Sequence, residues 1–272
     1  MRRLQLEYQI ENISVSYEEG SVLWPNAEFT CKKGLTANLK IWEDDIEPEQ
    51  IAKTWKNLEE LGESFQIAMK YLGNHSITFK KNDYVTYYFH DQRFTPWNEA
   101  EIGYLIKYLR GEIASFSVLS MTLPVPRFTG SGHQSPVPLP TIMPLIPHEL
   151  HGKAATLIVV DQLVNYPDLR LKLAYLLLEE FLGENALKND KIKYARDFVS
   201  HPICDSTKVV AFIISELPSA KLPSVKLGDR VRFDRRKGDH IAFVSKWADL
   251  ALQRAKGLFE DEVKNLGGCI RC

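Results

Sequence analysis

Long apolar runs are absent from this chain of 272 residues. A membrane-spanning helix needs about 20 consecutive, mostly apolar residues, and no segment approaches that length. The first residues include Arg2 and Arg3, but no apolar stretch follows them, so we do not expect a secretory signal. The sequence therefore predicts a cytoplasmic protein with no membrane partner.

Cysteine is also scarce, with 4 residues in the whole chain. Small secreted domains depend on a dense set of disulfides, which a few scattered cysteines do not provide. Cys269 and Cys272 form a C-x-x-C pair, but a structural zinc site takes four ligands and no second such pair completes it. We therefore expect neither a metal site nor a cofactor.

Several signatures of common enzyme classes are missing. The chain has no P-loop, no dinucleotide-binding glycine pattern, no His-Glu-x-x-His and no Gly-x-Ser-x-Gly. These absences argue against P-loop NTPases, nicotinamide-dependent oxidoreductases, zinc proteases and α/β-hydrolases. Catalysis, if present, has to rest on other side chains.

The net charge of −1 shows no overall excess of either sign, yet the two halves of the chain differ. Residues 151–272 contain 20 Lys and Arg against 16 Asp and Glu, whereas residues 1–150 contain 14 against 19. The positive surplus of the second half favours a polyanionic ligand there.

Residues 1–120 have the pattern of a mixed α and β domain, which we interpret as a sensor or partner-binding module. The expected strands are residues 4–10, 27–30, 36–42, 76–80 and 83–89. Residues 81–83 are expected to form a hairpin turn between the last two strands. Amphipathic helices are expected at 47–72 and 98–116. For the aromatic residues of this region, core packing is favoured over a ligand-binding face: Trp42, Trp55, Tyr84, Tyr87 and Tyr88.

Residues 121–150 contain 7 of the 14 prolines and separate this domain from the rest of the chain. Proline lacks an amide donor, so we expect a linker, or a strap lying across a neighbouring domain. Residues 151–272 have a helical pattern. The expected helices are residues 153–164, 168–182, 186–201, 205–217 and 239–266. Their short connections predict an all-α antiparallel bundle, so the expected fold class is α+β with a C-terminal helical bundle.

The most informative segment runs from Lys193 to Pro202 and reads KYARDFVSHP. In it Arg196 is followed directly by Asp197 and, five positions on, by His201. Arginine binds phosphate with a planar fork of donors, and histidine acts as acid or base near neutral pH. The two would lie about 140° apart on an ideal helix, but Pro202 disfavours a helical backbone at His201. Both side chains can then reach one surface, where they would hold a phosphodiester and move its protons without a metal.

This segment, set in a helical bundle, resembles the HEPN superfamily (higher eukaryotes and prokaryotes nucleotide-binding domain). Its members carry an arginine, a polar residue directly after it and a histidine four to six residues beyond the arginine, here Arg196, Asp197 and His201. The resemblance covers about residues 152–266 and does not extend to residues 1–150. It looks most like the metal-independent ribonucleases of toxin–antitoxin, CRISPR-linked and antiphage defence systems.

The resemblance implies that RNA is cleaved by its own 2′-hydroxyl, which DNA lacks. His201 would transfer protons, Arg196 would hold the phosphate, and Asp197 would orient one of the two. It also implies a homodimer, with two copies of the motif at one composite site, and an antitoxin or defence-system partner at the N-terminal domain. The alternative is a non-catalytic HEPN-like module that dimerises or binds RNA or a nucleotide, with Arg196 in a salt bridge to Asp190 or Asp197.

A second basic segment runs from Gly228 to His240. We assign its cations and its one aromatic ring as RNA-binding: Arg230, Arg232, Phe233, Arg235, Arg236 and Lys237. Cations that follow a phosphate backbone beside a stacking ring are typical of proteins that bind single strands. The alternative is a solvated hairpin in which Asp229, Asp234 and Asp239 neutralise the cations.

Overall fold

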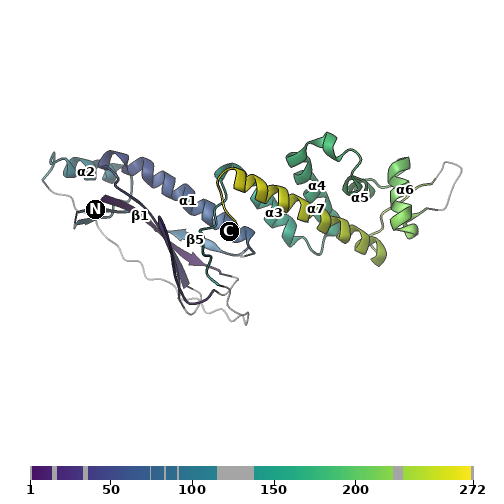
Figure 1. The fold of residues 1–272 in the computed structure, drawn as a ribbon, viewed down its shortest axis with the longest axis horizontal. Coiled ribbons are helices and arrows are strands. Elements are labelled where there is room, and N and C mark those ends of the chain that lie inside the picture. Colours follow the sequence, from purple (N-terminus) through teal and green to yellow (C-terminus); the bar gives the residue numbers. More distant parts are fainter. Residues whose placement is uncertain are drawn as a thin grey trace. The chain divides into compact units, whose positions relative to one another are not determined.

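The computed structural model describes residues 2–13, 17–32, 36–73, 75–82, 84–90, 92–114, 138–222 and 229–270. The chain divides into two compact units. Residues 1–148 and 268–272 form the first unit, and residues 149–267 form the second. The first contains an antiparallel sheet and the second is helical, so the α+β fold class is confirmed (Figure 1).

The sheet of the first unit has 7 strands. They are β1 (Arg2–Glu11), β2 (Gly20–Trp24), β3 (Ala27–Lys32), β4 (Thr36–Asp44), β5 (Thr78–Lys81), β6 (Thr86–Phe89) and β7 (Gln92–Phe94). Their order is β2-β3-β4-β1-β6-β7, and β5 also pairs with β1. β1 is therefore the central strand, with β4 along one edge and both β6 and β5 along the other.

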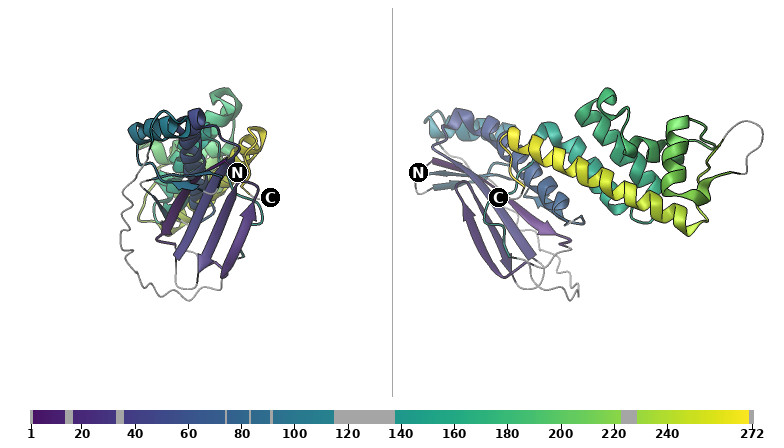
Figure 2. Two further views of the ribbon diagram at one scale, coloured as in Figure 1. Left: turned by 90° about the vertical axis from the view of Figure 1, so that its left-hand side faces the viewer. Right: turned by 45° about the vertical axis from the view of Figure 1, so that its right-hand side comes forward.

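One face of this sheet is covered by α1 (Ile51–Tyr71), which follows the short 3-10 turn η1 (Pro48–Gln50), and by α2 (Glu99–Leu109) (Figure 2). The alternation in β1 explains this arrangement, because Leu4, Leu6 and Ile10 are buried on one side together with Phe65 of α1. A later segment joins the same core, since the indole N–H of Trp24 donates to the carbonyl of Thr141 at 3.2 Å.

The hairpin predicted at residues 81–83 is wrong. β5 and β6 do not pair with each other; each pairs antiparallel with β1, at Tyr8–Glu11 and Arg2–Gln5 respectively. Both strands therefore run in the same direction, which no two-strand hairpin allows. The strands β2 and β7 were not predicted.

The second unit consists of α3 (His151–Gln162), α4 (Pro167–Leu182), α5 (Lys191–Ser200), α6 (Thr207–Glu216) and α7 (Gly238–Asn265). Three 3-10 turns accompany them: η2 (His148–Leu150), η3 (Glu184–Leu187) and η4 (Pro218–Ala220). The most extensive helix packing in this unit is between α4 and α7. Helices α3 and α5 also pack on both of these helices. Alanines on the buried side of α7, Ala248, Ala251 and Ala255, allow a close approach of its neighbours.

The helix predicted at 186–201 begins later than expected, at Lys191. Asp190 has extended backbone angles, and its carboxylate accepts a hydrogen bond from the N–H of Ile192 at 2.8 Å. This is the geometry of an N-cap, so the carboxylate starts a new helix there. The residues before it form η3 instead.

The residues on both sides of the second unit belong to the first unit and pair with each other. Leu145 and Cys269 form an isolated antiparallel bridge, with N–O distances of 2.6 and 3.1 Å in its two hydrogen bonds. Most of the predicted linker at 121–150, and Cys272 of the C-x-x-C pair, lie outside the described residues. Within the described part of the chain, none of the helices has the length and apolarity to cross a bilayer.

Candidate functional site

The end of helix α5 presents the Arg/His motif. The helix ends at Ser200, and His201 follows with an extended backbone at φ −107° and ψ 135°. The N–H of His201 still donates to the carbonyl of Asp197 at 3.1 Å. Pro202 accounts for the change of conformation, because a residue before proline avoids helical angles. The predicted end of the helix is therefore confirmed, and the side chain of His201 is exposed.

Arg196 is fixed by neighbours on α4 and on its own helix. Its guanidinium lies over the ring of Tyr175, 4.3 Å from the ring centroid. Nη1 is 3.2 Å from Oδ1 of Asp197, and Nη2 is 3.8 Å from Oε1 of Glu179. The side chain is 26% exposed. We call Tyr175, Glu179, Arg196 and Asp197 the arginine cluster.

Nε of Arg196 is buried and lacks a hydrogen-bond partner among the described residues, and the buried hydroxyl of Tyr175 interacts with Glu179 and Arg196. Tyr175 is fully buried, and this burial raises the pKa of its hydroxyl above the ordinary value. The hydroxyl therefore stays protonated and can donate. Nε of Arg196 is an unused donor, and an oxygen atom from outside would reach it only if the cluster opened.

The sequence offered Asp190 and Asp197 as alternative salt-bridge partners of Arg196, and the structure distinguishes them. Asp197 does pair with Arg196, whereas Asp190 pairs with Arg254 of α7 and caps α5. Glu179 and Tyr175 were missed because their contact with Arg196 depends on the packing of α4 against α5. No local pattern in the sequence reports that packing.

The structure brings Arg196 and Asp197 together, but it does not link either of them to His201 by a side chain. Among the described residues, no side-chain hydrogen bond or ion pair joins the imidazole of His201 to them. The motif thus consists of a fixed arginine and an exposed, unconstrained histidine beyond the helix end.

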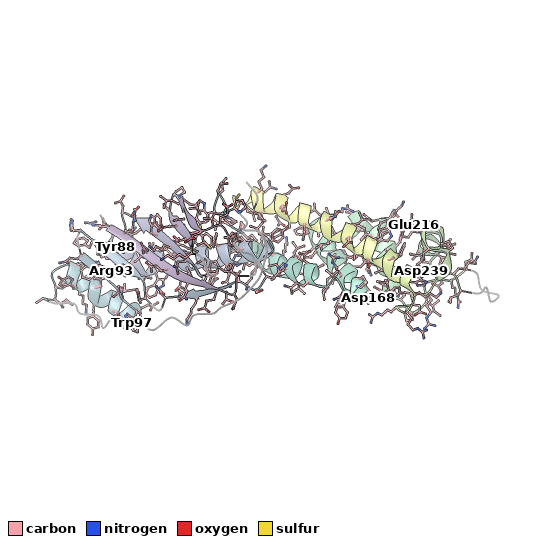
Figure 3. All side chains as sticks on the ribbon, turned by 90° about the horizontal axis from the view of Figure 1, so that it is seen from below. Tyr88, Arg93, Trp97, Asp168, Glu216 and Asp239 are labelled. Carbon is pink, nitrogen blue, oxygen red and sulfur yellow. The ribbon has the colours of Figure 1, made fainter. Side chains whose placement is uncertain are left out.

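The basic segment is partly neutralised within the second unit. Arg235 pairs with Asp168, a buried carboxylate in the first turn of α4 (Figure 3). Nε of Arg236 is 3.1 Å from Oδ1 of Asp234, and the hydrogen bonds from Arg236 lower the pKa of Asp234 to about 2. Nζ of Lys237 donates to the carbonyl of Ser219 at 3.1 Å.

The other three residues of this segment lie differently. Arg232 is exposed, and Arg230 is half-buried. The ring of Phe233 packs edge-on against Phe198 of α5, with 5.7 Å between centroids. The neighbouring Val231 forms bridges to Cys204 and Lys221, so the described part of the segment is not a hairpin of its own.

His240 was not singled out from the sequence, yet it lies in the core beside the motif helix. It is 1% exposed, and its ring centroid is 5.9 Å from that of Phe198. Nδ1 accepts a hydrogen bond from the N–H of Asp234 at 3.1 Å, and burial lowers the pKa of the imidazole. His240 is therefore a neutral, structural histidine, which its position before a long helical pattern did not reveal.

In the first unit, core packing is confirmed for Tyr87. It is fully buried, and its hydroxyl donates to the carbonyl of Ile46 at 2.9 Å. Tyr88 follows it in β6 and so points to the opposite face of the sheet, where it is half-buried. Arg93 of β7 pairs with Tyr88 in the strand register and is exposed (Figure 3).

Within the described ranges, no group of three or more His, Cys, Asp or Glu side chains is arranged to hold a metal ion. The chain matches no protein-family model, no curated protein and no solved structure. The arginine cluster and the end of α5 are therefore the basis for a functional assignment.

Proposed function

We propose that the protein is a metal-independent endoribonuclease of HEPN type that acts as a homodimer in a toxin or antiphage defence system. The observation that carries this proposal is the position of Arg196, whose Nε lacks a hydrogen-bond partner among the described residues, on the helix that ends at the exposed His201. A phosphate oxygen satisfies such a donor better than any neutral group.

The proposed reaction uses the 2′-hydroxyl of RNA as the nucleophile. A base removes its proton, the oxygen attacks the adjacent phosphorus, and an acid protonates the leaving 5′-oxygen. His201 is the proton-transfer residue, since its exposed imidazole follows the helix end. Arg196 offsets the charge that grows on the phosphate oxygens, and Asp197 holds its Nη1 in place. The products are a 2′,3′-cyclic phosphate and a 5′-hydroxyl.

The basic segment belongs to the same proposal as a binding surface for the RNA strand. Arg232 is exposed, and Arg235 and Arg236 remain largely exposed although each has an acidic partner. Phosphate contacts of this kind act independently of base sequence and weaken as salt rises. An antitoxin or another defence-system protein is the proposed partner of the first unit, and the cytoplasm is the proposed location.

The test is cleavage of a structured RNA by the full chain with EDTA present. We expect His201→Ala to lower the cleavage rate by about 100-fold or more, the range for loss of a general acid or base. Arg196→Ala should lower it by about 100-fold or more through loss of electrostatic stabilisation. His201→Ala should leave circular dichroism unchanged, because its side chain is exposed. Arg196→Lys, which keeps a cation beside Glu179 and Asp197, checks that loss of activity in Arg196→Ala is not loss of the fold.

His90→Ala is the matched control, since His90 is an exposed histidine of the first unit. It should cleave at the wild-type rate. Cleavage that persists in His201→Ala, or that leaves other phosphate ends, would exclude the proposed reaction.

One observation favours a second candidate, the non-catalytic HEPN-like module. Two carboxylates, Glu179 and Asp197, face one guanidinium, so the cluster is negative before any ligand binds. Such a cluster ties α5 to α4 as an ordinary structural ion pair does. If folded wild-type protein binds RNA or a partner chain but never cleaves, this module replaces the ribonuclease.

A further inference from the structure

Helix α4 is apolar around most of its circumference, although α3, α5 and α7 leave part of that circumference exposed. Its inward face is fully buried at Leu171, Ala174 and Leu178. On the opposite side, Leu169 is 43% and Leu176 is 56% exposed, and Leu173 is half-buried. A helix with apolar residues on every side is normally covered on every side.

The same helical hairpin exposes further apolar side chains near the start of α4. Val159 of α3 and the connecting residues Val164 and Tyr166 are between 50% and 64% exposed. Single exposed apolar residues are common, but a run of them along one hairpin marks an interaction surface. We call Leu169, Lys172, Leu173, Leu176 and Glu180 the outer stripe of α4.

The charges of the outer stripe are symmetric about Leu176. Lys172 lies four residues before it and Glu180 four residues after it, so all three occupy one face of the helix. In the part of the chain that the structure describes, neither Lys172 nor Glu180 takes part in an ion pair. Two unpaired charges of opposite sign thus flank an exposed leucine at equal spacing.

We propose that the outer stripe is the docking surface for a second copy of this chain, with the two α4 helices antiparallel about a two-fold axis at Leu176. In that arrangement Leu176 meets the same residue of the other copy. Lys172 faces the partner's Glu180, and Glu180 faces the partner's Lys172. A two-fold interface requires such self-complementarity, which the spacing of these residues provides.

This inference deepens the proposed function and rests on it for the need for two copies, while the surface is argued from exposure and charge alone. The outer stripe also borders the arginine cluster, because Glu179, the neighbour of Glu180, contacts Arg196. Docking along α4 would place the rim of the interface beside Arg196 in both copies.

The test is the mass of the full-length protein, measured by sedimentation over a hundredfold range of concentration. We expect a wild-type dimer and a monomer for Leu176→Asp. Lys172→Glu and Glu180→Lys should each raise the dimer dissociation constant at least about tenfold, because like charges then face each other. The double variant Lys172→Glu/Glu180→Lys restores opposite charges and should recover most of that loss.

Leu250→Asp is the matched control, since Leu250 of α7 is 42% exposed and lies outside the stripe. It should assemble like the wild type. A wild-type monomer, or a dimer that survives Leu176→Asp, would overturn the docking surface; so would a dimer that both charge reversals leave unchanged.

RNA cleavage, measured on the same samples, separates the two proposals. A monomer that still cleaves in EDTA overturns the docking surface and the proposed homodimer, and retains only the metal-independent cleavage. A dimer that Leu176→Asp dissociates, but that never cleaves, retains the surface and overturns the ribonuclease. Binding of a different protein to the stripe of a monomeric chain would assign the surface to that partner instead.

Discussion

At the scale of single residues, the structure distinguishes two histidines that the sequence does not. His201 is exposed at the end of α5, while His240 is buried among aromatic rings and accepts a hydrogen bond from the N–H of Asp234. A titratable group in the core links folding to pH, whereas an exposed one is free for chemistry.

His240 should make the stability of the protein depend on pH. Burial lowers its pKa in the folded state, and this outweighs the nearby Asp239 and Asp234, which act in the opposite direction. The unfolded chain therefore takes up the proton first as the pH falls. The stabilising contribution is complete above about pH 6.5, the unfolded value, and is lost as the pH falls toward the folded pKa.

We expect His240→Phe to flatten this dependence in urea unfolding measured between about pH 5 and pH 8. The substitution should lower the free energy of unfolding by about 1 kcal/mol at neutral pH, because the N–H of Asp234 loses its acceptor. An unchanged slope in His240→Phe would show that other groups cause the dependence.

At the scale of secondary-structure elements, the strongest local patterns predicted the fold best. Alternation located β1, and two further predicted strands overlap β3 and β4. Asn98 and Gly183 act as the N-cap of α2 and the C-cap of α4. Strand pairing was not predictable, because two strands share one edge of β1 and no local pattern encodes that choice.

In the candidate site, too, contacts between separate elements could not be predicted from local sequence patterns. The motif of Arg196 and His201 was visible as a spacing along the chain. Tyr175 and Glu179 contact Arg196 from another helix, so only the packed unit reveals them.

The packing of α1 on β1 depends on a residue without a side chain. A Cβ atom at Gly62 of α1 would overlap the ring of Tyr8 in β1, which is 5% exposed. Gly62→Ala should therefore destabilise the first unit by about 1–3 kcal/mol, as overpacking does. This loss exceeds the gain in helix propensity of about 1 kcal/mol.

Gly103→Ala in α2 is the control, since nothing lies within 4 Å of the added atom. It should stabilise the protein by about 0.5–1 kcal/mol. Thermal unfolding checks both variants, and Tyr8→Leu should relieve much of the cost of Gly62→Ala in a double-mutant cycle. Equal effects of the two alanines would contradict the proposed overlap.

At the scale of the whole molecule, the second unit is an insertion into the first. The first unit resumes at Gly268, and Cys269 pairs with Leu145 from the other side of the insertion. The two connections to the helical unit therefore start from neighbouring backbone positions.

This closeness predicts that the helical unit can be removed. A chain in which a short Gly-Ser linker replaces residues 149–267 should keep the sheet, because a linker of a few residues spans neighbouring positions at little entropic cost. Circular dichroism should show a cooperative transition, and Gly62→Ala should destabilise the shortened chain as it does the full one. A shortened chain that is unfolded would show that the sheet needs the helices.

The bridge between Leu145 and Cys269 can form only after Cys269 has been synthesised, and Cys269 follows the whole helical unit in the chain. Helices α3 to α7 are synthesised before residues 268–270 are added, so the helical unit has been translated before the first unit gains its last described segment. A protein that recognises the completed first unit would consequently bind a chain whose helical unit has already been translated.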